Sequence, residues 1–318
     1  MSEKLNSALD TAGPQAGRIE DLWWLLFGFC AVVFVAVMAV LVAALVRRRT
    51  PDESMEPTYA GQRTALRYVG AGVLATGAIL LGFLIASVTT DRGLDEIETG
   101  GARVLTITGR QWWWEIRYED ARPDRVVVTA NEIHVPVGQP VLLRLRASDV
   151  IHSFWVPSLA GKRDLIPGRD TGLWIQANRP GTFQGQCAEF CGYQHAHMRF
   201  LVIAQPPAEF DAWLEGQRAS APEPATDEER RGREVFLAGS CVMCHTIRGT
   251  AAGSIVGPDL THLASRQTIA AGARPNTRDH LAAWVADPQR TKPGARMPVP
   301  ELPPADLQAL VTYLRSLR

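Results

Sequence analysis

The sequence has no excess of charge of either sign. Its 318 residues include 33 lysines and arginines and 33 aspartates and glutamates, so the formal net charge is zero. This balance excludes a strongly basic nucleic-acid-binding protein. Apolar residues make up 46% of the chain, and its 27 glycines are too few for a collagen repeat. A disordered or collagen-like chain is therefore excluded as well, and about two domains are expected at this length.

The average composition conceals two long stretches that lack any charged residue. Residues 22–46 and 68–90 contain 25 and 23 consecutive uncharged residues. About 20 apolar residues cross the hydrocarbon core of a bilayer, so each stretch is long enough to span it. A buried helix of a soluble core rarely reaches this length without a charge. We therefore predict a transmembrane helical hairpin over residues 22–90.

The basic residues indicate the orientation of this hairpin. The connection 47–67 contains five arginines, whereas the N-terminal segment has only Lys4 and Arg18. The positive-inside rule then places the connection in the cytoplasm of a bacterial cell. Both termini, and everything after about residue 91, would lie on the outer face of the inner membrane. Residues 1–21 show no pattern of a cleavable signal peptide and are expected to be an external segment.

Residues 91–216 are expected to form an all-β domain. Short β-rich segments separated by turn signals include residues 104–108, 125–129, 141–147 and 200–204. This density of strands, without a helical period, predicts a sandwich or a small barrel. Residues 207–216 are expected to form a closing helix.

A change of composition marks the next boundary. Residues 217–229 (QRASAPEPATDEE) are rich in alanine, proline and acidic residues, which is typical of a semi-extended linker. Residues 230–318 show helical patterns joined by glycine- and proline-rich loops. Since about 90 residues provide little apolar core, a covalently held cofactor at the centre would help such a domain to fold.

Four of the five cysteines form two close pairs, and the fifth is Cys30 in the first apolar stretch. Disulfides are the simplest expectation on an oxidising membrane face, but each pair is accompanied by further metal-ligating residues. Cys241-Val-Met-Cys244-His245 is the C-x-x-C-H signature of covalent haem attachment, with the histidine as iron ligand. A thioredoxin-like pair would need a βαβ context that this helical segment lacks, and a zinc site would need two more ligands.

The second axial ligand of the haem iron is expected downstream of this signature. Met297 lies in a proline-flanked loop, and methionine ligation raises the reduction potential. His262 and His280 are the other candidates. His280 lies within a predicted helix and His262 follows a Gly-Pro-Asp-Leu-Thr segment, so packing or surface roles suit both. Met297 is therefore the predicted ligand.

The first cysteine pair lies in a loop dense in soft ligands. Its ligand-type residues are Cys187, Cys191, His195 and Met198. Thiolate, imidazole and thioether favour copper, or less well zinc, over magnesium or calcium. Two cysteines four residues apart can bridge two metals, each of which then needs one further strong and one weak donor. His152, on a candidate strand, is the expected second imidazole, and the main-chain carbonyl of Glu189 would be the remaining weak donor.

Alternatives to this ligand set come from the same residue types. A structural zinc site is one alternative, although methionine is a poor zinc ligand. His197 would compete for the metal from within the loop, whereas His134 lies in a strand-and-turn setting typical of a structural histidine. A cage of this kind leaves no open position for a substrate and suits electron transfer.

Three segments closely resemble cytochrome c oxidase subunit II: residues 109–118 (GRQWWWEIRY), 149–169 (DVIHSFWVPSLAGKRDLIPGR) and 179–198 (RPGTFQGQCAEFCGYQHAHM). With the haem signature, the chain is similar to the caa-type variant, in which a cytochrome c domain is fused to that subunit. The resemblance covers nearly the whole chain beyond residue 21. It implies a multidomain membrane protein with the transmembrane hairpin, an all-β cupredoxin-like domain and an all-α cytochrome c domain.

The resemblance also implies the residues of the sites. A binuclear copper A centre would be held by His152, Cys187, Glu189 through its carbonyl, Cys191, His195 and Met198, so that His197 is not a ligand. The side chain of Glu189 would also reach a magnesium ion at the boundary with the catalytic subunit. Trp112 matches the residue through which electrons enter the copper centre, with its neighbours in the Trp-Trp-Trp run as alternatives.

One feature of the family is missing from this sequence. Members often carry a glutamate followed by Trp-Thr at the start of the second helix, where it is linked to a proton channel. The corresponding stretch reads GQRTALRYVGAG here, and Glu56 is only a weak substitute. The sequence therefore gives no support for proton uptake through this subunit.

The function implied by the resemblance is that of an electron-accepting subunit of a respiratory oxidase, an oxidoreductase and translocase. Electrons would pass from cytochrome c, or from a quinol:cytochrome c oxidoreductase, through haem c and copper A to the haem–copper subunit I, which reduces oxygen. Subunit III and membrane lipid would be further partners. Two alternatives share these motifs: a subunit of a nitric oxide reductase, and a membrane-bound redox sensor or assembly protein.

The zero net charge is the sum of unequal parts. Residues 91–216 carry 13 basic and 16 acidic residues, a net charge of −3, whereas residues 217–318 carry 13 and 10, a net charge of +3. Opposite charges on two tethered redox domains would favour their docking. This pattern predicts docking that salt weakens.

Overall fold

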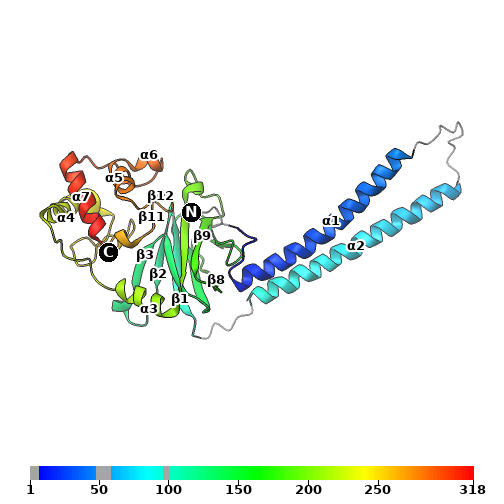
Figure 1. Cartoon of the computed structure of the whole chain (residues 1–318), viewed down its shortest axis with the longest axis horizontal. Helices are drawn as coiled ribbons and strands as arrows, with labels where there is room; N and C mark the ends of the chain where they lie inside the picture. The colour runs from blue at the N-terminus through cyan, green and yellow to red at the C-terminus, as the bar shows by residue number, and fades with distance from the viewer. Residues whose placement is uncertain (1–6, 48–58, 96–100) are drawn as a thin grey trace. The chain divides into compact units, whose positions relative to one another are not determined.

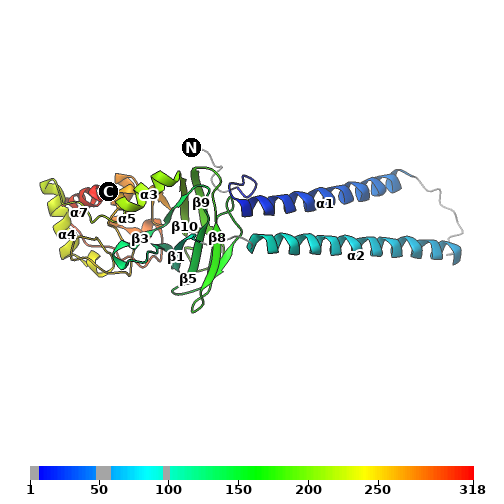
Figure 2. The ribbon, with the colours of Figure 1, turned by 90° about the horizontal axis from the view of Figure 1, so that it is seen from below.

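The structure, a computed structural model, describes residues 7–47, 59–95 and 101–318. It divides into two compact units, Gly17–Glu98 and a second one that joins Met1–Ala16 to Thr99–Arg318. The second unit contains a β-sandwich domain (residues 103–216) and a helical domain (residues 227–318) (Figures 1 and 2). The predicted class, a helical hairpin followed by an all-β and an all-α domain, is confirmed.

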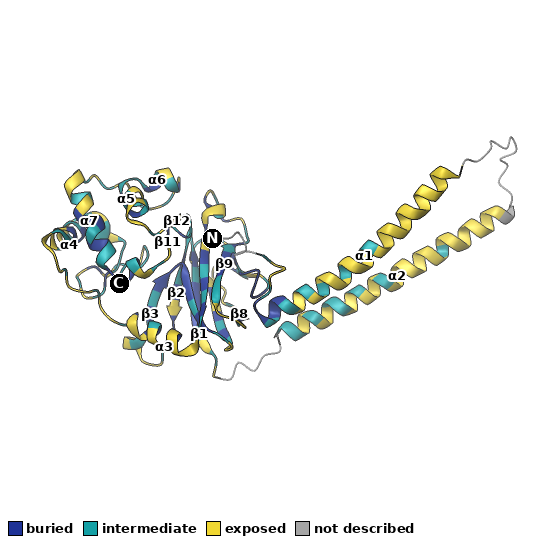
Figure 3. Ribbon diagram, in the orientation of Figure 1, coloured by how far each residue is buried: buried dark blue, intermediate teal, exposed yellow. Residues whose placement is uncertain are grey.

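The first unit consists of two long helices, α1 (Pro14–Val46) and α2 (Tyr59–Asp95), of which α1 begins in the second unit. Large apolar side chains such as Phe34 and Leu74 are exposed along them. The most apolar 18-residue stretch of each helix contains no buried residue (Figure 3). A helix in a soluble core would be buried, so this exposure fits helices that face lipid.

Some residues on which the sequence predictions depend lie outside the described residues. They are Lys4, Arg48 and Arg49, which bear on the orientation of the hairpin, and Glu56, the weak substitute for the family's glutamate. The cytoplasmic placement of residues 47–67 therefore stays a prediction.

The β-sandwich domain has two five-stranded sheets, in the orders β3-β2-β1-β5-β8 and β4-β10-β9-β6-β7. The first sheet contains β1 (Arg103–Arg110), β2 (Trp113–Tyr118), β3 (Val127–Ala130), β5 (Val141–Ala147) and β8 (Thr171–Ile175). The second contains β4 (Glu132–Pro136), β6 (His152–Trp155), β7 (Arg163–Leu165), β9 (Gly181–Cys187) and β10 (Arg199–Gln205). One predicted strand, 125–129, is shifted, because Pro123–Arg125 forms a 3-10 turn.

Alternating apolar residues fill the space between the two sheets. Leu105 and Ile107 of β1 lie opposite Leu143 and Leu145 of β5, and all four are fully buried. From the other sheet, Phe200 stacks on Phe154 with 4.5 Å between ring centroids. Because side chains alternate between the faces of a strand, β2, β5, β9 and β10 bury every second residue in this core.

The helical domain forms around a second, smaller core. Its α-helices are α4 (Asp227–Ala238), α5 (Arg278–Ala286), α6 (Pro288–Thr291) and α7 (Pro304–Ser316), with a two-stranded ribbon of β11 (Thr268–Ile269) and β12 (Arg274–Pro275). Thr226 and Glu229 form a capping box at the start of α4. Gly232 allows α4 to cross α7 closely, because a Cβ there would lie 2.1 Å from the carbonyl oxygen of Ala309.

The segment between the two domains is hydrogen-bonded rather than freely extended. The guanidinium of Arg248 donates to the carbonyls of Gln217 and Arg218, and Ala221 N–H donates to the carbonyl of Arg248. The imidazole of His262 donates to the carbonyl of Ala219. The sequence predicted a semi-extended linker over 217–229, but residues 217–219 and 221 are hydrogen-bonded to the helical domain, and residues 227–229 belong to α4.

The helix α3 (Pro207–Gly216) closes one end of the sandwich and covers His134. The imidazole of His134 stacks on the indole of Trp213 at 3.8 Å, and its Nδ1 lies 2.7 Å from Oε1 of Gln205. Burial lowers the pKa of His134 to about 4, against the hydrogen bond to Gln205. His134 is therefore a structural histidine of the fold.

We expect His134 to make the stability of the β-sandwich domain pH-dependent. Its folded pKa lies below the unfolded value, so the unfolded state binds more protons between pH 6.5 and 4. The free energy of unfolding should fall by roughly 3 kcal/mol as the pH drops through this window. Denaturant titrations of the wild type and His134→Phe, which keeps the ring stacking, measure the difference. Equal pH slopes in the two proteins would contradict this assignment.

Candidate metal centres

The predicted copper ligands come from one strand pairing and one loop. His152 begins β6 and Cys187 ends β9, and the two strands are antiparallel neighbours with Phe154 opposite Cys187. The loop that follows β9 supplies the other residues and contains a 3-10 turn, His195–His197. His152 and Met198 are fully buried. Gly109 of β1 leaves room for the imidazole, because a Cβ there would lie 2.8 Å from its Cδ2.

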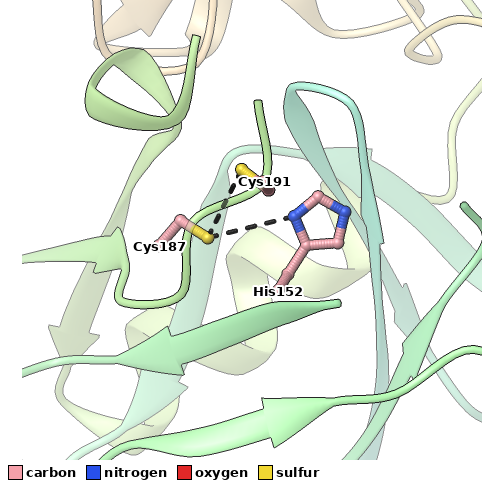
Figure 4. A group of neighbouring side chains, drawn as sticks. All are labelled: His152, Cys187 and Cys191. Carbon is pink, nitrogen blue, oxygen red and sulfur yellow. Dashed lines mark hydrogen bonds between the residues drawn. The ribbon is translucent and has the colours of Figure 1, made fainter. Parts of the chain in front are cut away.

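The donor atoms of all six predicted copper ligands lie next to one another. His152, Cys187 and Cys191 place their ligand atoms within 4.8 Å of one another (Figure 4). Around Cys187 Sγ lie Cys191 Sγ at 3.8 Å, His152 Nδ1 at 3.9 Å and the carbonyl oxygen of Glu189 at 3.2 Å. Around Cys191 Sγ lie His195 Nδ1 at 3.6 Å and Met198 Sδ at 3.8 Å.

This arrangement fits two soft metals bridged by two sulfurs. The cysteines are free, and their sulfurs are farther apart than the roughly 2.05 Å of a disulfide. One imidazole and one weak donor lie beside each sulfur. Two metals bridged by the sulfurs would each need one such pair of further ligands. Two thiolates with imidazole and thioether donors favour copper.

The two thiols share one negative charge when no metal is bound. The hydrogen bond between them lowers the pKa of Cys187 to about 3, helped by His152 and opposed by burial. The same hydrogen bond, with burial, raises the pKa of Cys191. Two adjacent thiolates repel each other, so cations that bind both sulfurs would displace the remaining proton.

Asp149 orients His152, a role that no sequence motif predicted. Nε2–H of His152 donates to Oδ1 of Asp149 at 2.8 Å, which leaves Nδ1 directed at Cys187. Burial raises the pKa of Asp149, but hydrogen bonds from His152 and from the amides of Gln111 and Val150 outweigh it, so the pKa is lowered. A ligating imidazole is commonly held through its second nitrogen in this way. The only sequence signal is an aspartate three residues before the histidine.

The remaining histidines are bound to other partners. Nδ1 of His197 contacts Gln194 Oε1 at 2.8 Å. His280 is bound to Thr277 at the start of α5. His262, as noted above, is directed at Ala219. These placements leave no imidazole rival to Met297 among the described residues that line the cavity of the helical domain.

The haem signature opens onto a cavity of about 410 Å³, lined by Cys241, Cys244, His245 and Met297 among others. Nδ1–H of His245 donates to the carbonyl of Pro258 at 2.8 Å, which leaves Nε2 available for iron. Arg266 also lines the cavity, and its Nε is buried without a partner. A group bearing carboxylates would satisfy this guanidinium, so the residues present fit a covalently attached haem.

Trp112 connects the two candidate centres. Its indole N–H donates to the carbonyl of Cys191 at 2.9 Å. The same residue lines the cavity of the helical domain, together with Arg110 and Gln111 from the β-sandwich domain. The two candidate centres thus share one wall. Trp114 is fully buried beside His152, and Trp113 lines the cavity, so the three tryptophans have different surroundings.

We expect Asp149→Ala to weaken copper binding by about 10- to 100-fold, the usual cost of losing the partner of a ligating histidine. Competition with a copper chelator on the full chain measures the affinity. Asp170→Ala is the matched control, because Asp170 pairs with Arg146 at the surface. Equal copper affinity in Asp149→Ala and the wild type would show that Asp149 does not orient His152.

Two family models match the chain. Residues 121–205 match the periplasmic domain of cytochrome c oxidase subunit II, and residues 229–318 match cytochrome c. Cytochrome c oxidase subunit 2 of Alkalihalophilus pseudofirmus is 38% identical, over 100% of this chain and 92% of that protein. The same subunit of Bacillus sp. (strain PS3) is 31% identical, over 77% of this chain and 70% of that protein.

Among solved structures, the periplasmic domain of subunit II of cytochrome oxidase of Bradyrhizobium japonicum is similar to part of the chain. It is 31% identical, with a TM-score of 0.35, and covers 36% of this chain and 93% of that one. The full-length match to the Alkalihalophilus protein and the two family models agree with each other. The chain therefore belongs to the cytochrome c oxidase subunit 2 family, and it is an oxidoreductase subunit that carries a cytochrome c domain after its oxidase-type domain.

Proposed function

We propose that this subunit takes electrons from an external donor into a covalent haem c in the helical domain and passes them through copper A to the catalytic subunit. The observation that carries this proposal is the double contact of Trp112. Its indole is hydrogen-bonded to the copper loop at Cys191 and also lines the cavity next to the haem signature. One side chain therefore touches the surroundings of both candidate centres.

The copper A ligands we propose are His152, Cys187, the carbonyl of Glu189, Cys191, His195 and Met198. Their support is the set of short distances around the two sulfurs and the burial of His152 and Met198. A buried, nearly fixed cage changes little between oxidation states. We also propose that the side chain of Glu189 reaches a magnesium ion shared with the catalytic subunit, as the family resemblance implies.

For the helical domain we propose thioether bonds at Cys241 and Cys244, with His245 and Met297 as the axial ligands. When bound, the haem and the copper pair would supply one-electron redox centres in series. The chain's own residues orient and shield them: Pro258 holds His245, Asp149 holds His152, and Trp112 separates the two sites.

We propose that α1 and α2 anchor the chain in the bacterial inner membrane, with the residues between them in the cytoplasm and both redox domains on the periplasmic face. The uneven distribution of arginine supports this orientation. The proposed domains are an external segment (residues 1–21), the transmembrane hairpin (22–90), the cupredoxin-like domain (91–216), a linker (217–229) and the cytochrome c domain (230–318). The partners would be subunits I and III, membrane lipid, and cytochrome c or a quinol:cytochrome c oxidoreductase as donor.

Copper content and spectroscopy test the copper assignment. The full chain is expected to bind two coppers that share one unpaired electron in electron paramagnetic resonance. Cys187→Ser and Cys191→Ser should lose this signal, while Cys30→Ser, in the membrane helix, should keep it. A single copper, or zinc alone, would contradict the binuclear assignment.

Purification of the complex tests the terminal acceptor. A large subunit with a high-spin haem should co-purify with the chain, and the complex should consume oxygen. Consumption of nitric oxide instead of oxygen would identify the complex as a nitric oxide reductase. Purification without such a subunit would point to a sensor or an assembly protein.

Replacement of Met297 tests the sixth ligand of the haem iron. Met297→Ala should convert the haem c from low spin to high spin, allow carbon monoxide to bind and lower the reduction potential, because a methionine ligand raises it. Absorption spectra of the reduced chain, with and without carbon monoxide, measure the first two changes, and a redox titration measures the potential. Met243→Ala is the control, since Met243 is exposed within the signature. An unchanged low-spin spectrum in Met297→Ala would exclude this ligand.

A further inference from the structure

A buried lysine of the helical domain contacts the β-sandwich domain. The chain has 33 basic residues, but only Lys4, Lys162 and Lys292 are lysines. Lys292 is 3% exposed, and its Nζ donates to the carbonyl of Trp112 at 2.6 Å and to that of Ala270 at 3.2 Å. Burial lowers the pKa of Lys292 to about 7. The amine is thus buried between the two domains, where its partners are carbonyl oxygens.

A buried glutamate of the β-sandwich domain makes the reciprocal contact. Glu132, at the start of β4, is 3% exposed. Its Oε1 accepts hydrogen bonds from the amides of Gln267 at 2.7 Å and Thr268 at 2.9 Å, and the hydroxyl of Thr268 lies 3.5 Å away. Each domain thus buries one ionisable side chain against backbone atoms of the other.

Further hydrogen bonds join the two domains. One, which is exposed, links the side chains of Arg296 and Gln111 at 3.1 Å, and two others have backbone carbonyls as acceptors. Gln194 Nε2 donates to the carbonyl of Pro293 at 2.6 Å, and the amide of Arg199 donates to the carbonyl of Ala271 at 3.0 Å. Within the part of the chain that the structure describes, no ion pair joins the β-sandwich domain to the helical domain. Hydrogen bonds to fixed backbone atoms define one register, which a pair of complementary surface charges does not.

Docking removes both groups from water, which is strongly destabilising unless hydrogen bonds replace the lost hydration. The docked arrangement supplies these bonds through the amides bound to Glu132 and the carbonyls bound to Lys292. A displaced register would leave both groups buried without these partners. The residue types also suit their places, because a compact ammonium fits between two carbonyls more readily than the planar guanidinium found at most basic positions of this chain.

We propose that Glu132 and Lys292 form a two-point lock, which holds the helical domain on the β-sandwich domain in one register and closes Trp112 to soluble electron donors. Both are positioning residues, and the proposal rests on the proposed function for its role in electron transfer. Lys292 lies five residues before Met297, so the same loop holds the candidate haem ligand and the backbone of Trp112. External electrons would then enter only through the helical domain.

Amine acylation tests the lock without any measurement of electron transfer. The full chain is treated with an acetylating N-hydroxysuccinimide ester, and mass spectrometry follows each lysine. Lys162 is exposed and serves as the internal reference. Lys292 should react about a hundredfold more slowly than Lys162, because it reacts only after the domains open. Equal rates at Lys292 and Lys162 in the folded chain would overturn the proposal.

Variants of Glu132 test the second point of the lock. Glu132→Ala removes the acceptor and should speed acetylation of Lys292 about tenfold or more, by raising the population of the open state. Glu132→Gln keeps an oxygen acceptor and should largely restore the protection. Glu209→Ala, at an exposed position of α3, is the matched control and should leave the rate unchanged. Full protection of Lys292 in a folded Glu132→Ala protein would exclude a role for Glu132.

The rate of electron transfer between the loaded centres tests the consequence for function. After photoreduction of the haem, the wild-type rate should stay constant from about 0.05 to 0.5 M salt, because buried contacts are screened little. Lys292→Met and Glu132→Ala should transfer electrons more slowly and in a salt-dependent way, with Lys162→Met as control. A salt-dependent wild-type rate would contradict a permanent lock.

The two measurements separate the lock from the proposed function. Protection of Lys292 without any electron transfer between the loaded centres would preserve the lock and remove the function assigned to it. Rapid electron transfer with an unprotected Lys292 would preserve the function and exclude the lock.

Discussion

The pairing of β6 with β9 is the constraint on which the copper site depends. Two cysteines in one loop can bridge metals, but each metal also needs an imidazole, and the loop offers only one suitably placed. The antiparallel register that sets Phe154 opposite Cys187 brings His152 beside the sulfur pair across 35 residues of sequence. The alternating burial along β9 and the full burial of Phe154 in β6 fix that register, because a slip by one residue would turn His152 away from the loop. The core of the sandwich therefore positions the metal ligands.

The wall shared by the two sites follows from the strand that precedes Trp112. β1 passes Gly109 beneath His152, and the chain then turns so that Gln111 binds Asp149 and Trp112 binds the copper loop. The aspartate that holds the histidine thus also holds the start of the turn that carries the tryptophan. These hydrogen bonds join the geometry of the copper site to that of the surface on which the helical domain lies. A change in the geometry of the copper site would therefore also change the surface on which the helical domain lies, and the reverse holds as well.

The charge totals gave an incomplete account of how the two domains meet. Net charges of −3 and +3 predicted docking through surface electrostatics. The structure also shows contacts that a net charge does not describe, in which buried side chains bind backbone atoms, as at Glu132 and Lys292. Net charge averages over a whole surface, whereas a buried charge acts on the few atoms that surround it. The linker departs from expectation for a similar reason, since Arg248 and His262 bind its backbone and hold it in place.

The sequence by itself determined the features that are local in the chain. Two uncharged runs, the C-x-x-C-H signature and the spacing of cysteine, histidine and methionine in one loop were sufficient to predict the hairpin, the succession of domains and the candidate ligands. His152 was identified by its residue type and by the family resemblance. Only the tertiary structure revealed Asp149, Glu132 and Lys292, because their roles depend on partners brought close by folding. Lys292 and Trp112 are 180 residues apart, and the partners of Glu132 are backbone amides, whose positions no side-chain motif encodes.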